Sequence, residues 1–294
     1  MPQITANNLH FEYESFGDES SPVMLLIMGL GAQLCRWHLP FCQALIDRGF
    51  RVIRFDNRDC GLSSKLDQAG VPDIGLTLRT GAPLTAPYTL DDMATDCVAL
   101  LDALAISRAH LVGASMGGAI GQIVAARYPQ RVLSLTCMMT TSGHPDLPPP
   151  TREAAQALFA PLPATRDRES LIEDALQRQL AVASPSFPDC PQRLRDAISE
   201  EHARSFHPRG VARHLAAFLA SDHRRDLLQT IRVPTLVIHG ADDPLIPVAC
   251  GYDVAAHIPG AELRVIDGMG HDLPVGLSEA FADAIATLAR HVAD

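Results

Sequence analysis

One short stretch of the sequence has the residue types of a nucleophile site. In LVGASMGGAI, residues 111–120, Ser115 stands between Gly113 and Gly117 in a Gly-x-Ser-x-Gly pattern. An apolar run precedes the serine and a helical pattern follows it, as a sharp strand-to-helix turn requires. Small residues two positions before and after the serine avoid collisions in such a turn. The pattern predicts a nucleophilic serine, although Gly and Ser packing an ordinary strand–helix junction would look the same.

A serine hydroxyl is a weak nucleophile until a base accepts its proton, and candidate partners lie downstream. His271 follows the apolar run ELRVID in the loop GMGHDLP, and Asp242 and Asp243 follow PTLVIHG. We expect His271 to act as general base and then as general acid; a surface turn histidine is the alternative. We expect Asp243 rather than Asp242 to orient it, because Pro244 and the turn DPLIP would point the Asp243 carboxylate inward.

Two backbone N–H groups are predicted to bind the oxyanion that forms when a serine attacks a carbonyl group. The helix that begins at Met116 would aim its N–H groups and its positive dipole end beside Ser115. Leu30, between Gly29 and Gly31 in the loop after VMLLIMG, is the second expected donor. Gly29 is also expected at the substrate pocket. A flexible glycine turn without a catalytic role is the alternative for this loop.

Other conspicuous side chains have structural alternatives. Trp37, beyond the glycine loop, would either contact substrate or pack the first helix. As a charged pair, Asp56 and Arg58 could act in catalysis, but we expect a structural role in which they tie the loop after a strand by hydrogen bonds. Four histidines lack metal-ligand spacing, and we expect them on solvated helix faces: His202, His207, His214 and His223. We predict no metal and no cofactor.

Alternating strand and helix patterns would position these residues. Apolar runs predict strands over residues 9–17, 23–29, 51–56, 109–114, 132–139, 234–240 and 262–267. Helical patterns cover residues 37–47, 90–105, 116–128, 248–258 and 278–291. This alternation predicts a mostly parallel sheet with helices on both faces. Thr89 and Asp92 are a candidate capping box, and the Gly- and Pro-rich residues 66–88 are expected to form a long loop.

A helical insertion interrupts the predicted sheet. Residues 143–228 begin with GHPDLPPP, whose prolines exclude a strand or helix, and continue with helical periodicity. We therefore expect a core of residues 1–142 and 229–294 and a helical cap of residues 143–228. The substrate pocket would depend on how this cap folds over the site.

Composition excludes several classes of partner. A net charge of −10 over 294 residues disfavours nucleic acid and anionic membranes. The longest apolar stretch, VMLLIMGLGA, is too short to cross a bilayer, and we expect no signal peptide. Seven scattered cysteines are expected to be buried free thiols of a cytoplasmic protein. The sequence does not indicate the oligomeric state, and a homodimer is one alternative.

Five motifs together resemble the α/β-hydrolase superfamily, and the resemblance spans almost the whole chain. They are MGLGA, FDNRDCGLSS, GASMGG, GADDPLIP and GMGH. RFDNRDCGLSS, DPLIP and GMGHDLP are similar to aclacinomycin methylesterase-like bacterial carboxylesterases. The resemblance implies an α/β fold with a mostly parallel eight-stranded sheet flanked by helices, a helical cap after the sixth strand, and a Ser-Asp-His hydrolase that forms an acyl-enzyme.

Two positions depart from the superfamily pattern. Met28 stands where a His usually precedes the oxyanion glycine, and Leu30 stands where the methylesterase-like sequences often have Gly. Both changes keep the backbone donors and alter the pocket wall, so they affect the expected substrate rather than the mechanism.

These observations predict a hydrolase of small-molecule carboxylic esters. A carbon–carbon bond hydrolase with the same triad is the first alternative, although QLCRWHLPF lacks the Asn that such enzymes usually carry there. A perhydrolase or thioesterase would use the same groups. A serine at 115 argues against chemistry that needs an aspartate nucleophile. A binding protein that has lost catalysis is the alternative from another class.

Overall fold

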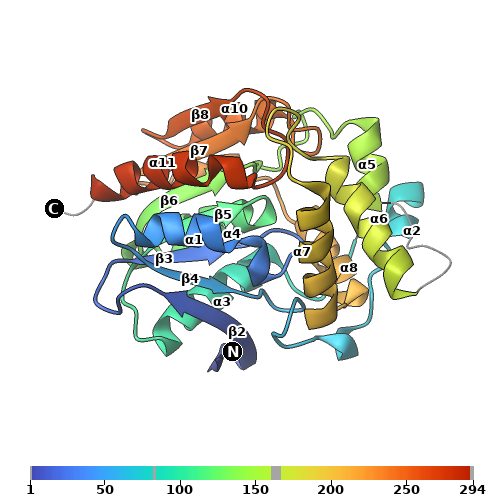
Figure 1. Cartoon of the computed structure of the whole chain (residues 1–294), viewed down its shortest axis with the longest axis horizontal. Coiled ribbons are helices and arrows are strands. Elements are labelled where there is room, and N and C mark those ends of the chain that lie inside the picture. Colours follow the sequence, from blue (N-terminus) through green and yellow to red (C-terminus); the bar gives the residue numbers. More distant parts are fainter. Residues whose placement is uncertain (1, 82–83, 160–166, 292–294) are drawn as a thin grey trace.

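The described residues of this computed structural model, 2–81, 84–159 and 167–291, form an eight-stranded sheet with helices on both faces (Figure 1). The strand order is β1-β2-β4-β3-β5-β6-β7-β8. β2 pairs antiparallel with β1 and β4, and the other neighbours are parallel. The strands are β1 (Gln3–Ala6), β2 (Leu9–Phe16), β3 (Val23–Ile27), β4 (Arg51–Phe55), β5 (Ala109–Ala114), β6 (Val132–Met138), β7 (Thr235–Gly240) and β8 (Glu262–Ile266).

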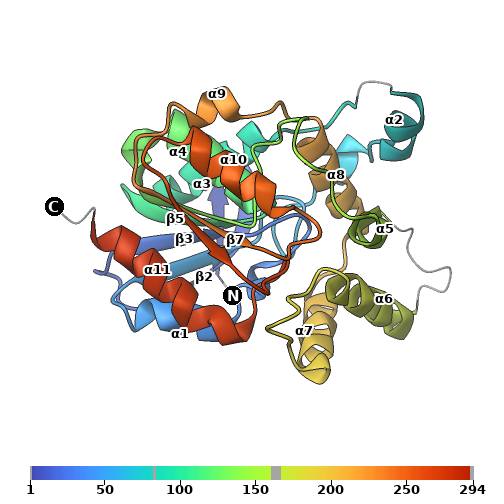
Figure 2. The same ribbon diagram turned by 90° about the horizontal axis from the view of Figure 1, so that it is seen from above.

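Helices cover the two faces of the sheet unequally (Figure 2). One face carries α1 (Leu39–Ile46) and α11 (Ser278–Arg290); the other carries α3 (Leu90–Ala103), α4 (Met116–Arg127) and α10 (Val248–His257). Strand β3 is buried on both faces, so all five of its residues are apolar. Its side chains alternate between the apolar cluster under α1 and α11 and the cluster under α3 and α4.

The chain leaves the sheet after β6 and returns at β7. In between it forms helices that lie mostly to one side of the sheet (Figure 2), and these are called the cap helices below. They are α5 (Arg152–Phe159), α6 (Arg168–Leu180), α7 (Pro191–Arg204), α8 (Pro208–Leu219) and α9 (Arg225–Leu228). Residues 160–166 of the predicted cap lie outside the described residues, as do residues 1, 82–83 and 292–294. The proposed boundaries of the cap at 143 and 228 stay a prediction.

Most core elements begin and end within two residues of the predicted bounds. The capping box is present, because Thr89 accepts the N–H of Asp92 and the Asp92 carboxylate accepts the N–H of Thr89. One strand was missed. β1 is joined to β2 by Asn7 and Asn8, whose φ values of +46° and +59° suit a tight hairpin turn that asparagine tolerates.

The prediction of a continuous loop over residues 66–88 is wrong at its centre. A short helix, α2 (Ile74–Thr80), forms there. The Asp73 side chain accepts the N–H of Leu76 at its start, and Gly81 adopts a left-handed conformation at its end. The capping residues were visible in the sequence, but the surrounding Gly and Pro content obscured them.

Candidate active site

Ser115 lies at the turn between β5 and α4. Its φ of +55° and ψ of −121° are strained for a residue with a side chain. A Cβ atom on Gly113 would lie 2.3 Å from the carbonyl oxygen of Gly117, and one on Gly117 would lie 2.0 Å from the carbonyl oxygen of Ile27. Glycine is therefore required at both positions by the close approach of neighbouring backbone.

Three side chains from separate loops form one hydrogen-bonded line. The Nε2 atom of His271 lies 3.1 Å from Oγ of Ser115, and its Nδ1 lies 2.7 Å from Oδ2 of Asp243. The Asp243 side chain is fully buried, and its Oδ1 accepts the backbone N–H groups of Leu245 and Ile246 at 2.9 and 2.8 Å. Because a carboxylate can only accept, Nδ1 carries the proton and Nε2 is free to accept the serine proton.

Asp242, the competing carboxylate, has a different partner. Its Oδ2 accepts the backbone N–H of Gly268 at 2.8 Å. Gly268 has a φ of +73° in the loop that leads to His271. Asp242 thus holds the base of this loop and, in the described structure, makes no hydrogen bond with the His271 ring.

The loop that contains Leu30 lies directly against Ser115. A Cβ atom on Gly29 would be 3.0 Å from the Ser115 Cβ. Met28 is anchored because its carbonyl oxygen accepts the side-chain N–H of Asn57 at 2.9 Å. Within the described residues, the backbone N–H groups of Leu30 and Met116 have no acceptor. Both groups are therefore free to donate to an oxygen bound beside Ser115.

Trp37 packs the first helix. Its side chain is fully buried, and its indole ring stacks on Phe41 of α1 with ring centroids 5.4 Å apart. A fully buried ring has no surface with which to contact a substrate, so the structure supports the packing alternative for Trp37.

Asp56 and Arg58 do not form a pair with each other. Asp56 is fully buried and lies 2.6 Å from Arg204 of α7, while Arg58 lies 2.6 Å from Asp96 of α3. Burial raises the pKa of Asp56, and Arg204 opposes that rise. Both residues are structural, as expected, but the partner of Asp56 is on a cap helix.

The expectation that the cap histidines occupy solvated helix faces is wrong for His214. Its side chain has no exposed surface. Its ring bonds to the backbone of Gly31 and Arg58 in the core. The helical pattern of α8 places residue 214 beside Arg213 on the buried face, and this pattern was the signal that could have identified it.

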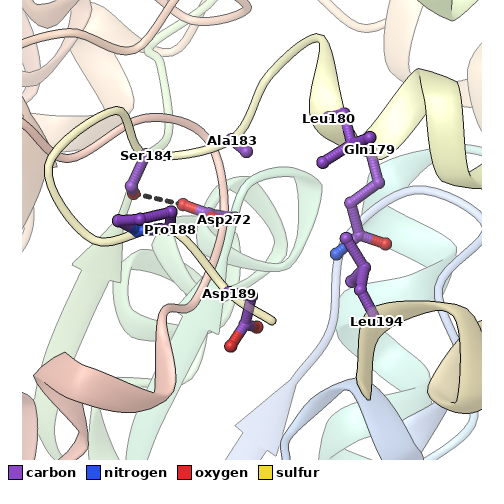
Figure 3. Close-up of a pocket in the computed structure, with 8 residues that line it drawn as sticks. All are labelled: Gln179, Leu180, Ala183, Ser184, Pro188, Asp189, Leu194 and Asp272. Atoms are coloured by element: carbon purple, nitrogen blue, oxygen red, sulfur yellow. Dashed lines mark hydrogen bonds between the residues drawn. The ribbon is translucent and has the colours of Figure 1, made fainter. Parts of the chain in front are cut away.

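The segment that follows α6 crosses the loop that carries His271. The carbonyl oxygen of Val182 accepts the N–H of His271 at 2.7 Å, and the Ser184 hydroxyl accepts the N–H of Gly270 at 2.9 Å. Ser184 also donates to Asp272, as Figure 3 shows. Burial raises the pKa of Asp272, and this hydrogen bond opposes the rise. No sequence pattern indicated this contact between the cap and the histidine loop.

A small cavity of about 60 Å³ lies beside this contact, between α6, α7 and the Asp272 side chain (Figure 3).

Within the described part of the chain, no group of three His, Cys, Asp or Glu side chains is arranged to hold a metal ion. No helix in the same part is long and apolar enough to span a membrane. The seven cysteines are free thiols; five are buried as expected, whereas Cys35 is partly buried and Cys190 is exposed.

The chain is similar to known proteins over nearly its whole length. A family profile described as alpha/beta hydrolase fold matches residues 22–275. The chain is 30% identical to the rhodomycin D methylesterase DauP of Streptomyces sp. (strain C5), over 98% of this chain and 97% of that protein. It is 30% identical to the putative carbamate hydrolase RutD of Caulobacter sp. (strain K31), over 97% of each chain. The crystal structure of the enol-lactonase from Burkholderia xenovorans LB400 superposes with a TM-score of 0.73 at 26% identity, over 98% of this chain and all of that one.

Proposed function

The chain belongs to the alpha/beta hydrolase family, and we propose that it is a serine hydrolase of small-molecule carboxylic esters. The observation that carries this proposal is the line of hydrogen bonds from Asp243 through His271 to Ser115. At the Ser115 end of this line are the N–H groups of Leu30 and Met116, which have no acceptor among the described residues. A nucleophile, a base, an acid and two oxyanion donors are the groups that acyl transfer needs.

The proposed reaction begins when Oγ of Ser115 bonds to the ester carbonyl carbon and His271 accepts the serine proton. The carbonyl oxygen becomes negatively charged and accepts the N–H groups of Leu30 and Met116. As the carbon–oxygen bond to the alcohol breaks, His271 returns the proton to the leaving alkoxide. Asp243 stabilises the imidazolium between these two steps and keeps its ring in place.

Water completes the reaction by the same steps in reverse order. His271 accepts a proton from water as the water oxygen attacks the acyl carbon. The second oxyanion collapses, the bond to Ser115 Oγ breaks, and His271 returns the proton to the serine. The products are the free acid and the alcohol, and the reaction consumes only the ester and one water molecule.

The names of two relatives favour esters over the other substrates of this machinery. One relative is named a methylesterase and another an enol-lactonase, and both names denote carboxylic esters, open-chain in the first and cyclic in the second. Carbon–carbon bond, thioester and peracid chemistry would use the same residues, and no observation among the described residues favours them. The experiment below therefore tests thioesters and vinylogous diketones beside the esters.

The test compares the wild type with Ser115→Ala on nitrophenyl esters, methyl esters, lactones, thioesters and vinylogous diketones. We expect ester hydrolysis by the wild type and a loss in kcat of at least about 10⁴-fold in Ser115→Ala. Rapid-quench mass spectrometry of the wild type should find the acyl group on Ser115. Ser20→Ala, at an exposed serine before the start of β3, is the matched control and should keep full activity.

Two results would overturn the proposal. One is ester hydrolysis that survives in Ser115→Ala. The other is a wild type that cleaves the diketones and leaves every ester intact. Equal melting temperatures of wild type and Ser115→Ala would show that any loss is chemical rather than a failure to fold.

A further inference from the structure

His214 of the cap helix α8 reaches the loop that contains Leu30. Its Nδ1 atom accepts the backbone N–H of Gly31 at 3.1 Å, and its Nε2 lies 2.6 Å from the carbonyl oxygen of Arg58. A carbonyl oxygen can only accept and an amide N–H can only donate, so the ring proton sits on Nε2. Burial lowers the pKa of His214 to about 4, which keeps this neutral tautomer at neutral pH.

The N–H that His214 binds belongs to the central peptide of a tight turn. The backbone N–H of Ala32 donates to the carbonyl oxygen of Gly29 at 3.3 Å, which places Leu30 and Gly31 at the two inner positions. Gly31 has a φ of +67°, as the third residue of a type II turn requires. Rotation of the Leu30–Gly31 peptide would give the other turn type. An acceptor on its N–H therefore holds one orientation of the loop.

Helix α8 is seated firmly enough to act as a support. A Cβ atom on Gly210 would lie 2.0 Å from the carbonyl oxygen of Asp59, so the helix backbone touches the core directly. Arg213, next to His214, is fully buried and lies 2.7 Å from the Asp59 carboxylate. Val211 packs over the turn itself, because a Cβ atom on Gly31 would lie 2.9 Å from its Cγ2. The helix that carries His214 thus contacts the turn through Val211 as well.

We propose that His214 is a positioning residue of the oxyanion hole, which acts through the Gly31 N–H to hold Leu30 where its own N–H can donate. The inference rests on the proposed function. The donor matters most when the carbonyl oxygen becomes charged, so His214 stabilises the transition state more than the bound substrate. Loss of its Nδ1 acceptor should therefore lower kcat and leave KM nearly unchanged.

Two substitutions separate the two hydrogen bonds of His214. In His214→Asn the amide oxygen takes the place of Nδ1 and can still accept from Gly31. In His214→Gln the amide group reaches the place of Nε2, so the bond to Arg58 is kept and the bond to Gly31 is lost. We expect kcat for a nitrophenyl ester to fall about 10- to 100-fold in His214→Gln, less than the 10²- to 10³-fold typical of losing a whole donor. His214→Asn should stay within about 5-fold of wild type, and KM should change by less than about 3-fold in both.

A trifluoromethyl ketone supplies a second readout, because its adduct with a serine carries an oxyanion. Its inhibition constant should rise in His214→Gln by the same factor by which kcat/KM falls. His214→Met, which fills the site without either hydrogen-bonding group, should behave like His214→Gln and replaces it if the glutamine variant does not fold. His110→Gln is the matched control, since His110 of β5 is also buried but bonds to Ser134 of β6, and the kcat of this variant should not change.

Several outcomes would overturn the inference. They are wild-type kcat in His214→Gln and His214→Met, equal losses in the Asn and Gln variants, or an unchanged inhibition constant. Ser115→Ala separates this inference from the proposed function. A loss of activity in Ser115→Ala together with full activity in His214→Gln would remove only the role of His214, whereas an active Ser115→Ala would remove both.

Discussion

The sheet core and the cap helices are held in place by different interactions. The core contains two large clusters of buried apolar side chains, one on each face of the sheet. Among the cap helices, the described residues form one small buried cluster of their own, made of Ile172, Leu176, Leu194 and Ile198, while Ala217 and Leu228 join one of the core clusters. Among the described residues, ion pairs join the cap helices to the core, and they include Asp56–Arg204, Asp59–Arg213 and Arg36–Glu201.

Apolar burial mainly stabilises the core, whereas the ion pairs mainly fix where the cap helices lie. Apolar burial stabilises a fold in rough proportion to area and depends little on direction. Buried charged groups contribute little net stability but are costly to leave unpaired, so each pair fixes the position of a cap helix on the core. Hydrogen bonds from the same part of the chain also reach the Leu30 turn, through His214 of α8, and the His271 loop, through Val182 after α6. The cap helices therefore support both halves of the proposed site.

The largest expected effect concerns the hydrogen bond between Asp243 and His271, which the core supplies. In Asp243→Asn the new amide oxygen can still accept from Leu245 and Ile246, so the side chain should keep its place. Its NH₂ group would then face Nδ1 of His271, which must become an acceptor, and the ring proton would move to the nitrogen that faces Ser115. We expect kcat to fall by about 10⁴-fold, because the wrong tautomer cannot accept the serine proton. Steady-state hydrolysis of a nitrophenyl ester measures this loss.

Asp242→Asn is the matched control for that variant. Asn can still accept the N–H of Gly268, so the loop should keep its shape and kcat should remain within about 10-fold of wild type. If Asp242→Asn were instead the more damaging change, the carboxylate that orients His271 would be Asp242, one residue earlier than proposed. The hydrogen bond between Asp243 and His271 would then be structural only.

The second prediction tests the attachment of the cap. Arg213→Met removes a buried cation and leaves the Asp59 carboxylate without it, and both side chains are fully buried. We expect a loss of about 3–5 kcal/mol in the free energy of unfolding, measured by urea titration. Arg195→Met is the control. Arg195 joins Glu169 and Glu173 on the exposed surface of the cap, and its loss should lower the free energy of unfolding far less. Equal small losses would show that the buried pair does not hold α8.

The same contrast explains what the sequence could predict. The elements around Ser115, and the glycines beside it, are encoded in local patterns such as apolar runs and Gly-x-Ser-x-Gly. The choice of Asp243 over Asp242 as the contact of His271 also followed from a local signal, Pro244 and the turn DPLIP that begins at Asp243. The role of these residues in catalysis remains a proposal that the variants above test.

The contacts of the cap had no comparable signal. Arg213 and Asp59 are 154 positions apart, and Asp56 and Arg204 are 148 apart. Nothing near any of these residues specifies its partner, so the sequence predicted a structural role for Asp56 but not its contact with Arg204. The helical pattern of α8 placed His214 on the buried face, but nothing near it in the sequence specified its partners, the backbone of Gly31 and Arg58.

The last prediction asks whether core and cap unfold as one unit. Burial lowers the pKa of His110 in the core and of His214 in the cap from 6.5 to about 4. Between these two pH values the unfolded chain binds a proton at each site and the folded chain does not. The stability from each buried neutral ring is therefore complete above pH 6.5 and is lost as the pH falls towards 4.

Removing either histidine should lower the slope of unfolding free energy against pH by about 1.4 kcal/mol per pH unit in that window. Urea titrations of wild type, His110→Asn and His214→Asn between pH 4.5 and 7 measure the slopes. If both variants lower the pH slope of the main unfolding transition equally, the cap helices and the core unfold as one cooperative unit, joined by the charged contacts. If only His110→Asn lowers the pH slope of the main transition, the cap unfolds before the core. Its ion pairs would then fix the position of the cap without adding to the stability of the core.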